Sequence, residues 1–154
     1  MLFDIDKKPQ HSLAAIDDHG DQLTYGEICD LRDELSKLLP PRELVYCLCA
    51  NRVGSLAGFL ALYDCKDVCL LLNASIDKEL LDALYETYTP AYFWMPESTS
   101  HNYSVLYSYK GYVLAKTGEI SPVLHPDLSM LMTTSGTTGS PKLVRHKYGN
   151  IESN

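Results

Sequence analysis

Hydroxyl groups and glycines are concentrated in one short segment of the chain, residues 133–142. The segment is Thr-Thr-Ser-Gly-Thr-Thr-Gly-Ser-Pro-Lys, so six of its first eight residues carry a hydroxyl and the other two are Gly136 and Gly139. Successive backbone amides and hydroxyl donors of such a loop can converge on one anion, and Lys142 would add a positive charge. The residue types and their spacing therefore predict a loop that binds a polyphosphate, and hence nucleotide chemistry.

The predicted loop differs in its flanks from the commonest phosphate loop. A Walker A loop has the pattern Gly-x-x-x-x-Gly-Lys-Ser/Thr and leads into a helix, whose first amides hold the phosphate. Here Pro141 stands between the second glycine and the lysine, and it disfavours a helical conformation at Ser140. Leu143 and Val144 follow the loop, and residues 128–132 precede it as an apolar run. Both flanks favour strands, so we expect a strand, a loop and a strand, without a helix dipole at the phosphate.

Residues 134–142 resemble a known signature, Thr-Ser-Gly-Thr-Thr-Gly-x-Pro-Lys, which is the phosphate loop of the adenylate-forming superfamily. This superfamily includes acyl-CoA synthetases, peptide-synthetase adenylation domains and luciferases. Upstream, residues 14–28 are similar to its opening hairpin and helix, and residues 59–73 to its passage from a helix to a strand. Four positions depart from the pattern: Lys66 and Leu143 stand where the family usually has glycine, Leu71 where it usually has proline, and Tyr148 where it usually has histidine. The likeness covers nearly the whole chain, which resembles only about the first third of the family's large domain.

The resemblance implies the N-terminal portion of an ATP-dependent ligase that activates a carboxylate as an acyl-adenylate. The activated acid would then form a thioester with CoA or with the phosphopantetheine thiol of an acyl carrier. The substrates would be ATP and a small carboxylic acid, and Mg²⁺ would be held by ligands outside this chain. The signature implies that Lys142 is the catalytic cation, which supports charge on the pyrophosphate leaving group. The residues implied to bind ATP are Thr134, Ser135, Gly136, Thr137, Thr138, Gly139 and Lys142.

The same resemblance predicts that residues 1–154 are a single truncated N-terminal subdomain of an AMP-binding domain. The chain reaches Asn154 before the family's magnesium-binding acidic motif, its ribose-binding aspartate and its C-terminal catalytic lysine could occur. We therefore expect the chain alone to be inactive and to bind triphosphate or pyrophosphate weakly. A truncated sheet can leave unpaired strand edges, so the chain could also self-associate.

Two other classes of function are consistent with a phosphate-binding loop. One is a non-catalytic module that binds a phosphate or a nucleotide without turnover, and it predicts tight binding by this chain alone. The other is a kinase-like phosphotransferase, which would need a Walker loop and a metal-binding carboxylate on a neighbouring strand. Pro141 argues against the phosphotransferase.

Hydrophobic patterns along the rest of the chain alternate between strand and helix. Thr24 and Glu27 form a capping-box pair that predicts the start of a helix. The buried helix faces are expected to include Leu38 in that helix and Leu56 in the next. The other expected elements are a hairpin of residues 14–16 and 22–24, strands at 44–50, 68–72 and 91–95, helices at 53–64 and 77–88, and a tyrosine-rich hairpin that turns at residues 110–111. This order predicts an α/β fold with a parallel or mixed sheet, flanked by helices and extended by β-hairpins.

Charge is distributed unevenly along the chain. The formal net charge is −7: residues 1–139 hold ten Lys and Arg against nineteen Asp and Glu, a balance of −9, whereas residues 140–154 hold three against one, a balance of +2. The acidic body argues against nucleic acid or an anionic membrane as a partner of the general surface. The basic side chains gather beside the loop, where a phosphate site would need them: Lys142, Arg145, His146 and Lys147.

The remaining polar residues indicate no second chemical site. Five cysteines lack the spacing of a zinc site or a disulfide framework, so they are expected to be small buried side chains, and no metal ligand is assigned. Five scattered histidines suggest no catalytic triad. We attribute Asp17, Asp18 and Asp21 to solvated turn chemistry, and the tyrosine row to sheet packing in preference to adenine stacking. No signal peptide or membrane segment is visible, so a cytoplasmic location is expected.

Overall fold

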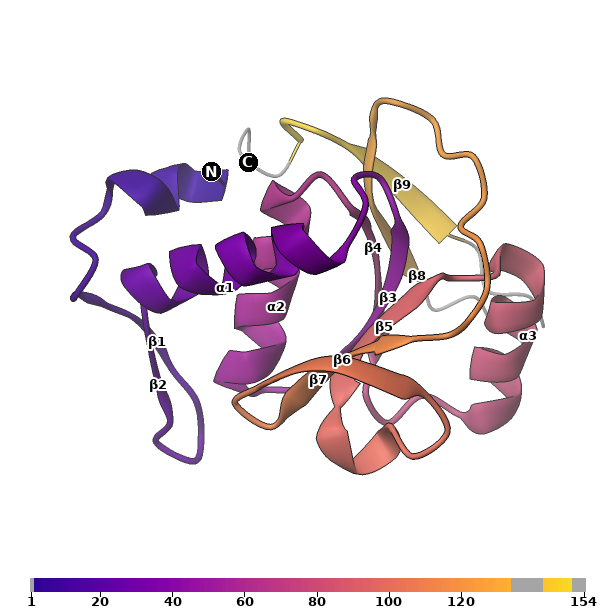
Figure 1. Cartoon of the computed structure of the whole chain (residues 1–154), viewed down its shortest axis with the longest axis horizontal. Helices are drawn as coiled ribbons and strands as arrows, with labels where there is room; N and C mark the ends of the chain where they lie inside the picture. The colour runs from indigo at the N-terminus through magenta and orange to yellow at the C-terminus, as the bar shows by residue number, and fades with distance from the viewer. Residues whose placement is uncertain (1, 134–142, 151–154) are drawn as a thin grey trace.

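A seven-stranded β-sheet forms the centre of the molecule, with helices against both of its faces (Figure 1). The computed structural model describes residues 2–133 and 143–150. The helices are α1 (Tyr25–Leu38), α2 (Val53–Asp64) and α3 (Lys78–Tyr88), with short 3-10 helices at Leu2–Lys7 and Glu97–Thr99. The strands are β1 (Leu13–Ile16), β2 (Gln22–Thr24), β3 (Leu44–Cys49), β4 (Val68–Asn73), β5 (Tyr92–Pro96), β6 (Ser104–Tyr109), β7 (Tyr112–Lys116), β8 (Leu128–Thr133) and β9 (Leu143–Lys147).

The large sheet is mixed, with strand order β6-β7-β5-β3-β4-β8-β9. Its inner strands β5, β3, β4 and β8 are parallel, whereas β6, β7 and β9 each run antiparallel to a neighbouring strand. Strands β3 and β4 pair along their whole length, and β1 and β2 form a separate hairpin. The predicted α/β class, with a parallel or mixed sheet flanked by helices and additional hairpins, is confirmed, and the sheet is of the mixed kind.

Side chains of the inner strands alternate between two apolar cores, one on each face of the sheet. On β3, Val45 and Cys47 pack in the core that contains α1 and α2, whereas Leu44, Tyr46 and Leu48 pack in the core beneath α3. Figure 1 shows α1 and α2 on one side of the sheet and α3 on the other. Strands buried on both faces have continuous apolar sequences, which explains the apolar run that predicted β3.

Helix α1 begins where the capping pattern predicted it. The side-chain oxygen of Thr24 accepts a hydrogen bond from the Glu27 backbone at 3.2 Å, and the Glu27 carboxylate accepts one from the Thr24 backbone at 2.8 Å. The prediction that Leu38 is buried is wrong, because Leu38 is 38% exposed and Leu39 takes the buried position. The reason is that α1 ends at Leu38 and the extended backbone of Leu39 turns that side chain inwards.

Helix α2 is buried over most of its circumference because it approaches the sheet closely. An ideal Cβ at Gly58 would lie 2.0 Å from the Trp94 indole, and the indole Nε1 donates a hydrogen bond to the Gly54 backbone oxygen at 3.0 Å. Leu56, expected on the buried stripe, is 41% exposed, so that prediction is wrong. The face that packs most closely carries small residues, and the larger side chain at position 56 points outwards.

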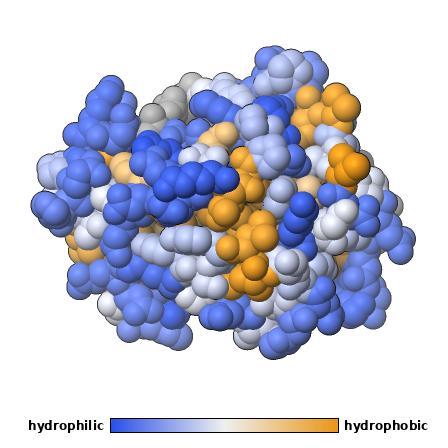
Figure 2. Space-filling model, viewed as in Figure 1, coloured by the Kyte–Doolittle hydropathy of each residue, from blue (hydrophilic) through white to orange (hydrophobic). Residues whose placement is uncertain are grey.

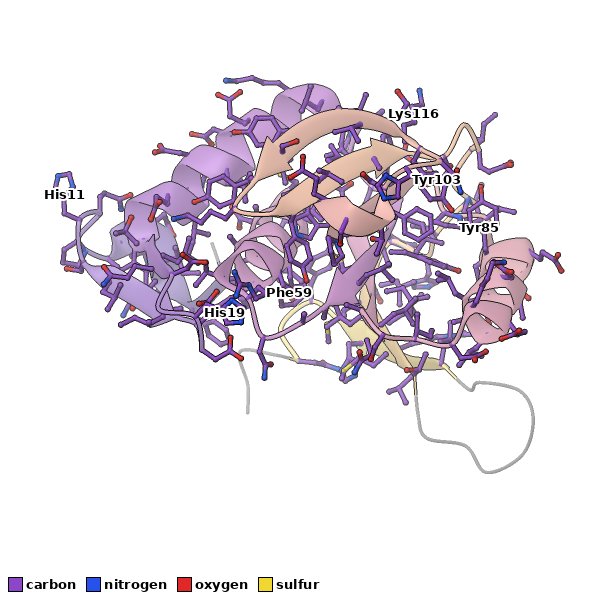
Figure 3. All side chains as sticks on the ribbon, turned by 90° about the horizontal axis from the view of Figure 1, so that it is seen from below. His11, His19, Phe59, Tyr85, Tyr103 and Lys116 are labelled. Atoms are coloured by element: carbon purple, nitrogen blue, oxygen red, sulfur yellow. The ribbon has the colours of Figure 1, made fainter. Side chains whose placement is uncertain are left out.

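The tyrosine-rich hairpin, β6 and β7, extends the sheet beside β5. Its turn residues Lys110 and Gly111 have φ values of 44° and 75°, and positive values at both positions are those of a type I′ turn. The Tyr112 ring stacks on Trp94 with centroids 6.0 Å apart, and the Tyr103 ring packs on Phe93 at 5.0 Å. Both tyrosines therefore pack within the fold, as the sequence analysis preferred, and Figure 3 shows Tyr103 at the α3 side of the sheet.

Each of the five cysteines is at least partly buried in the fold. All five cysteines belong to the described residues and none of them forms a disulfide, with Cys47 and Cys69 buried and the other three partly buried. Polar side chains cover most of the face shown in Figure 2, with smaller apolar patches between them. Within residues 2–133 and 143–150, no helix has both the length and the apolar character needed to cross a membrane.

Candidate functional site

The C-terminal ends of the parallel strands β3, β4 and β8 meet at one edge of the sheet, here called the carboxyl edge. Register pairs Cys49 with Asn73 and Leu71 with Met132, so the three strands end nearly level. Strand β8 ends at Thr133, directly before the segment predicted to bind phosphate. In open α/β sheets, ligands bind in the crevice outside the carboxyl ends of the strands. Strand β8 therefore brings the start of the predicted loop to the edge where such folds bind ligands.

The predicted site residues themselves lie outside the described residues. They are Thr134, Ser135, Gly136, Thr137, Thr138, Gly139 and Lys142. Their flanks are described, and β8 and β9 form an antiparallel pair in which Thr133 is opposite Leu143. The prediction of a strand on each side of the loop is thus confirmed. The pairing also holds both ends of the segment side by side at the carboxyl edge.

Basic side chains on β9 differ in their contacts. The Lys147 ammonium lies 3.2 Å from the Asp127 carboxylate. The His146 backbone oxygen accepts a hydrogen bond from the Ser129 hydroxyl at 3.0 Å. Arg145 is exposed, and among the described residues it has no ion-pair partner. On β9, the Arg145 guanidinium is therefore the charge most available to an anion near the loop.

A pocket of about 540 Å³ opens at the carboxyl edge, between the β1–β2 turn, the end of β3 and the start of α2. Leu56, Phe59 and Leu71 form its apolar wall, and the exposed Ile16 lies at its mouth. Figure 3 labels Phe59 on α2 and His19 in the β1–β2 turn, the two elements that border the pocket. Because Leu71 pairs in register with Met132 of β8, the apolar wall continues towards the strand that leads to the predicted loop.

Asp17 ties the β1–β2 turn to the first turn of α2. Its side chain is 3% exposed, and its carboxylate accepts hydrogen bonds from the backbone of His19 and Asp21 at 3.0 Å and of Val53 at 3.2 Å. Burial alone would raise the pKa of Asp17, but these hydrogen bonds and the Arg52 charge outweigh it and lower the pKa. The prediction that Asp17 is a solvated turn residue is therefore wrong, although Asp17 does lie in the turn. Its contact with Val53 could not be predicted, because no local pattern indicates a bond between residues 36 positions apart.

The electrostatics of the pocket rim do not suit a phosphate. Arg52 is held by two carboxylates, with its Nη2 2.9 Å from Asp21 and its Nε 3.5 Å from Asp17. Asp18 also lines the pocket, so the two carboxylates paired with Arg52 and a third carboxylate outnumber the single guanidinium at this rim. A phosphate would be repelled there, since like charges at short range are unfavourable. Nor do the described residues contain a group of His, Cys, Asp or Glu able to hold a metal ion.

Opposite the carboxyl edge, the base of the β8–β9 hairpin is held by Arg42, in an arrangement that we call the Arg42 clamp. The guanidinium donates hydrogen bonds to the backbone oxygens of Leu128 at 2.8 Å and His125 at 2.6 Å, and to the Tyr148 hydroxyl at 3.1 Å. The Tyr148 hydroxyl donates in turn to the Lys66 backbone oxygen at 3.1 Å. Tyr148, where the sequence departs from the superfamily pattern, thus has a structural role at the far end of the hairpin from the loop.

Comparisons with solved structures identify the fold as that of the N-terminal part of adenylate-forming enzymes. The sequence matches no family model and no curated protein. The chain is similar to O-succinylbenzoate coenzyme A synthetase (MenE) from Bacillus subtilis in complex with AMP, with a TM-score of 0.69, 17% identity, and coverage of 99% of this chain and 43% of that one. For apo MatB from Rhodopseudomonas palustris the TM-score is 0.71 and the identity 20%, with coverage of 97% of this chain and 34% of that one. For the N-terminal subdomain of NpsA from Klebsiella oxytoca the TM-score is 0.64 and the identity 20%, with coverage of 94% of this chain and 40% of that one.

At sequence identities of 17–20%, the similarity to these solved structures shows the fold of the chain. This is the fold that the resemblance in sequence had predicted. The chain spans 34–43% of the length of these solved chains. Other structures of MenE contain ATP with a magnesium ion, or the acyl-adenylate intermediate OSB-AMP, and another structure of MatB contains ATP. Proteins with this fold therefore include enzymes that bind ATP and form an acyl-adenylate.

Proposed function

We propose that this chain is the phosphate-binding portion of an ATP-dependent ligase of the adenylate-forming superfamily. The observation that carries the proposal is that the superfamily's loop signature, residues 134–142, falls between β8 and β9 in a chain with the fold of MenE and MatB. The complexes of MenE and MatB with ATP support ATP as the nucleotide, and the magnesium ion in MenE supports that metal. The parent enzyme would activate a carboxylic acid as its adenylate, and residues 1–154 would be one N-terminal subdomain of it.

The described residues fit an anion at this edge of the sheet. Paired Thr133 and Leu143 hold both ends of the loop together, and the exposed Arg145 lies on the strand that leaves it. In the proposed reaction, negative charge builds on the pyrophosphate as it leaves the α-phosphorus. Hydroxyl and amide donors of residues 134–139 would bind that charge, and a preorganised donor of this kind contributes about 3 kcal/mol to transition-state stabilisation. Lys142 would supply a full positive charge to the same leaving group.

Other components of the reaction would come from outside the described residues. Magnesium, when bound, would neutralise phosphate charge, and its ligands are expected outside this chain. The acyl group would pass to CoA or to the phosphopantetheine thiol of a carrier. We further propose that neither nucleic acid nor an anionic membrane is a partner, because the net charge of the chain is −7. We also propose a cytoplasmic location, which is supported by five cysteines whose odd number and irregular spacing do not suit a disulfide framework.

The role of Lys142 can be tested on this chain by titrating it with magnesium pyrophosphate in a calorimeter. We expect weak binding, with a Kd of about 1 mM, because the loop is only one part of the proposed nucleotide site. Lys142→Ala should weaken that binding about tenfold, the equivalent of about 1.4 kcal/mol. The matched control is Lys8→Ala, which removes the same charge from an exposed position near the N-terminus and should leave the Kd unchanged. Equal affinities of the wild-type and Lys142→Ala chains would contradict the assignment of Lys142.

A second measurement separates the ligase from the non-catalytic module. The chain alone should show no carboxylate-dependent exchange of pyrophosphate into ATP, whatever acid is supplied. Micromolar binding of ATP without exchange would favour the module, since a complete binding site would then be present in these residues. Observed exchange would show that the chain is catalytically complete and that the expectation of inactivity is wrong. The proposed self-association can be followed in the same samples by analytical ultracentrifugation.

A further inference from the structure

Two acidic residues, Glu43 and Asp67, are in contact at the amino edge of the sheet, where the parallel strands begin. Asp67 lies in the connection between α2 and β4, and Glu43 immediately precedes β3. The Glu43 backbone N–H donates to the Asp67 carboxylate at 2.9 Å, and the Val68 backbone N–H donates to the Glu43 backbone oxygen at 2.8 Å. These bonds fix the Asp67 carboxylate and the Glu43 backbone at the start of two neighbouring strands, away from the predicted phosphate loop.

Each carboxyl group keeps one buried oxygen without a hydrogen-bond partner among the described residues. These oxygens are Oδ2 of Asp67 and Oε2 of Glu43. Asp67 is completely buried, so water does not replace the missing partner at its surface. A buried carboxylate oxygen without a donor is strongly unfavourable, and a second negative charge nearby increases the cost.

Arg42, the cation that acts on Asp67, does not pair with it directly. Arg42 is next to Glu43 in sequence, but its guanidinium donates to backbone oxygens of Leu128 and His125 and to Tyr148, as the clamp requires. Its charge still lowers the pKa of Asp67 at longer range. In the described part of the chain, five ionisable side chains interact electrostatically with Asp67. Arg42 and Glu43 precede β3, Cys47 lies on β3, Cys65 follows α2 and Tyr92 lies on β5.

Burial is the main cause of a raised pKa at Asp67, and the Glu43 charge adds to it. Hydrogen bonds from the backbone of Glu43 and Arg42 act in the opposite direction, and the resulting pKa is about 7. An ordinary aspartate in an unfolded chain has a pKa of 3.8. The direction of the shift agrees with the geometry, because a protonated Asp67 would turn one of the two unpartnered oxygens into a donor.

We propose that the buried Asp67 side chain keeps its proton in the folded chain, as a carboxylic acid in contact with the Glu43 backbone. On deprotonation Asp67 releases this proton to solvent, and its carboxylate is left buried with one oxygen that no described residue hydrogen-bonds. The cost falls on the contact between the α2–β4 connection and Glu43, the residue next to Arg42 of the clamp. Asp67 thus makes the stability of this edge depend on pH, and this proposal does not depend on ATP binding or catalysis.

The sign of the effect follows from the raised pKa. Folding keeps a proton that the unfolded chain has released, so the stabilisation is complete below about pH 4 and is lost as the pH rises to about 7. Within that window, a one-proton difference raises the unfolding equilibrium constant by about tenfold per pH unit. Unfolding of the whole chain depends on pH through its other ionisable groups as well, so the comparison must be between variants at each pH.

The experiment is urea unfolding of the full 154-residue chain at a series of pH values from about 4 to about 8. Asp67→Asn keeps the oxygen that accepts from Glu43 but cannot titrate, so its unfolding constant should lack the acid-to-neutral rise seen in the wild type. Glu43→Gln removes the neighbouring charge, so the rise should begin at the same pH but end at a lower pH than in the wild type. Asp30→Asn is the control, because Asp30 is an exposed carboxylate on α1, and its profile should follow that of the wild type.

Infrared spectroscopy gives an independent measure of the proton. The wild type near pH 6 should show a carbonyl band of a protonated carboxylic acid, and this band should be absent in Asp67→Asn and retained in Asp30→Asn. Parallel pH profiles of the wild type and Asp67→Asn, or the same acid band in both, would overturn the proposal. Because pyrophosphate is not used in either measurement, this result is separate from the test of the proposed ligase.

Discussion

Gly58 is the position where a single carbon atom would disturb the packing of α2 on the sheet. Its ideal Cβ would lie 2.0 Å from the Trp94 indole, far inside the ordinary contact distance between carbon atoms. Trp94 is completely buried, and its Nε1 donates to the Gly54 backbone oxygen, so the ring cannot move aside without losing that bond. Glycine is required here by the close approach of a helix backbone to an aromatic ring.

We expect Gly58→Ala to destabilise the folded chain. Alanine would gain about 1 kcal/mol in helix propensity, but overpacking in a dense core costs about 1–3 kcal/mol and more against a fixed ring. Since the clash involves the indole ring itself, the steric cost should be the larger, with a net loss of about 2 kcal/mol in urea unfolding. Leu56→Ala, at a 41% exposed position of the same helix, should cost less. A more stable Gly58→Ala chain would show that the helix can move to accept the methyl group.

At the level of elements, the β8–β9 hairpin is fixed at both of its ends. Pairing of Thr133 with Leu143 holds the loop end, and the Arg42 clamp holds the base. Arg42 itself has a φ of 73°, in the left-handed region that non-glycine residues seldom adopt. The backbone therefore accepts some strain at a residue whose side chain reaches three acceptors on the hairpin and its flanks.

Arg42→Met should loosen the hairpin at its base, because it removes all three hydrogen bonds while keeping an unbranched apolar side chain. The expected loss is about 2 kcal/mol of unfolding free energy, in the range for hydrogen bonds to a charged group that leave acceptors unpaired. Amide hydrogen exchange should accelerate more in β8 and β9 than in β3 and β4. Lys116→Met, an exposed charge removal on β7, serves as the control. Equal acceleration in all four strands would mean that the clamp supports the whole sheet and not the hairpin in particular.

For the whole molecule, the central strands separate two cores and bury reactive groups between them. Cys47 and Cys69 lie on the adjacent strands β3 and β4 and are 1% and 0% exposed. The Cys47 thiol forms a hydrogen bond with Cys69. This bond, together with burial, raises the pKa of the Cys47 thiol well above the usual range. Both thiols should therefore be inert until the sheet opens, which makes them reporters of global stability.

Labelling with iodoacetamide should distinguish these thiols from Cys29, which is partly buried on α1. Modification of Cys47 and Cys69 requires global opening, so it should be at least about 100-fold slower than that of Cys29 and should accelerate with urea in parallel with unfolding. Peptide mass spectrometry measures each site separately. Labelling of Cys47 at the rate of Cys29 would indicate a local opening of the central strands under native conditions.

Local signals in the sequence were sufficient for the type and order of most elements. The pair Thr24 and Glu27 predicted the start of α1, the 110–111 turn predicted the β6–β7 hairpin, and apolar runs predicted β3, β4, β5 and β8. These features are determined by neighbouring residues, so they can be recognised without knowledge of the rest of the fold. The loop signature was likewise visible in the sequence, and its roles remain proposals because residues 134–142 lie outside the described residues.

Only the tertiary structure decided which side of each helix is buried and which distant residues meet. Hydrophobicity placed Leu56 inwards, but the close approach of α2 to Trp94 favours glycines on that face. The bond of Asp17 to Val53, the Arg42 clamp and the pairing of Glu43 with Asp67 join residues 24 to 106 positions apart. Such contacts depend on how strands and helices pack, and no pattern within one element contains that information.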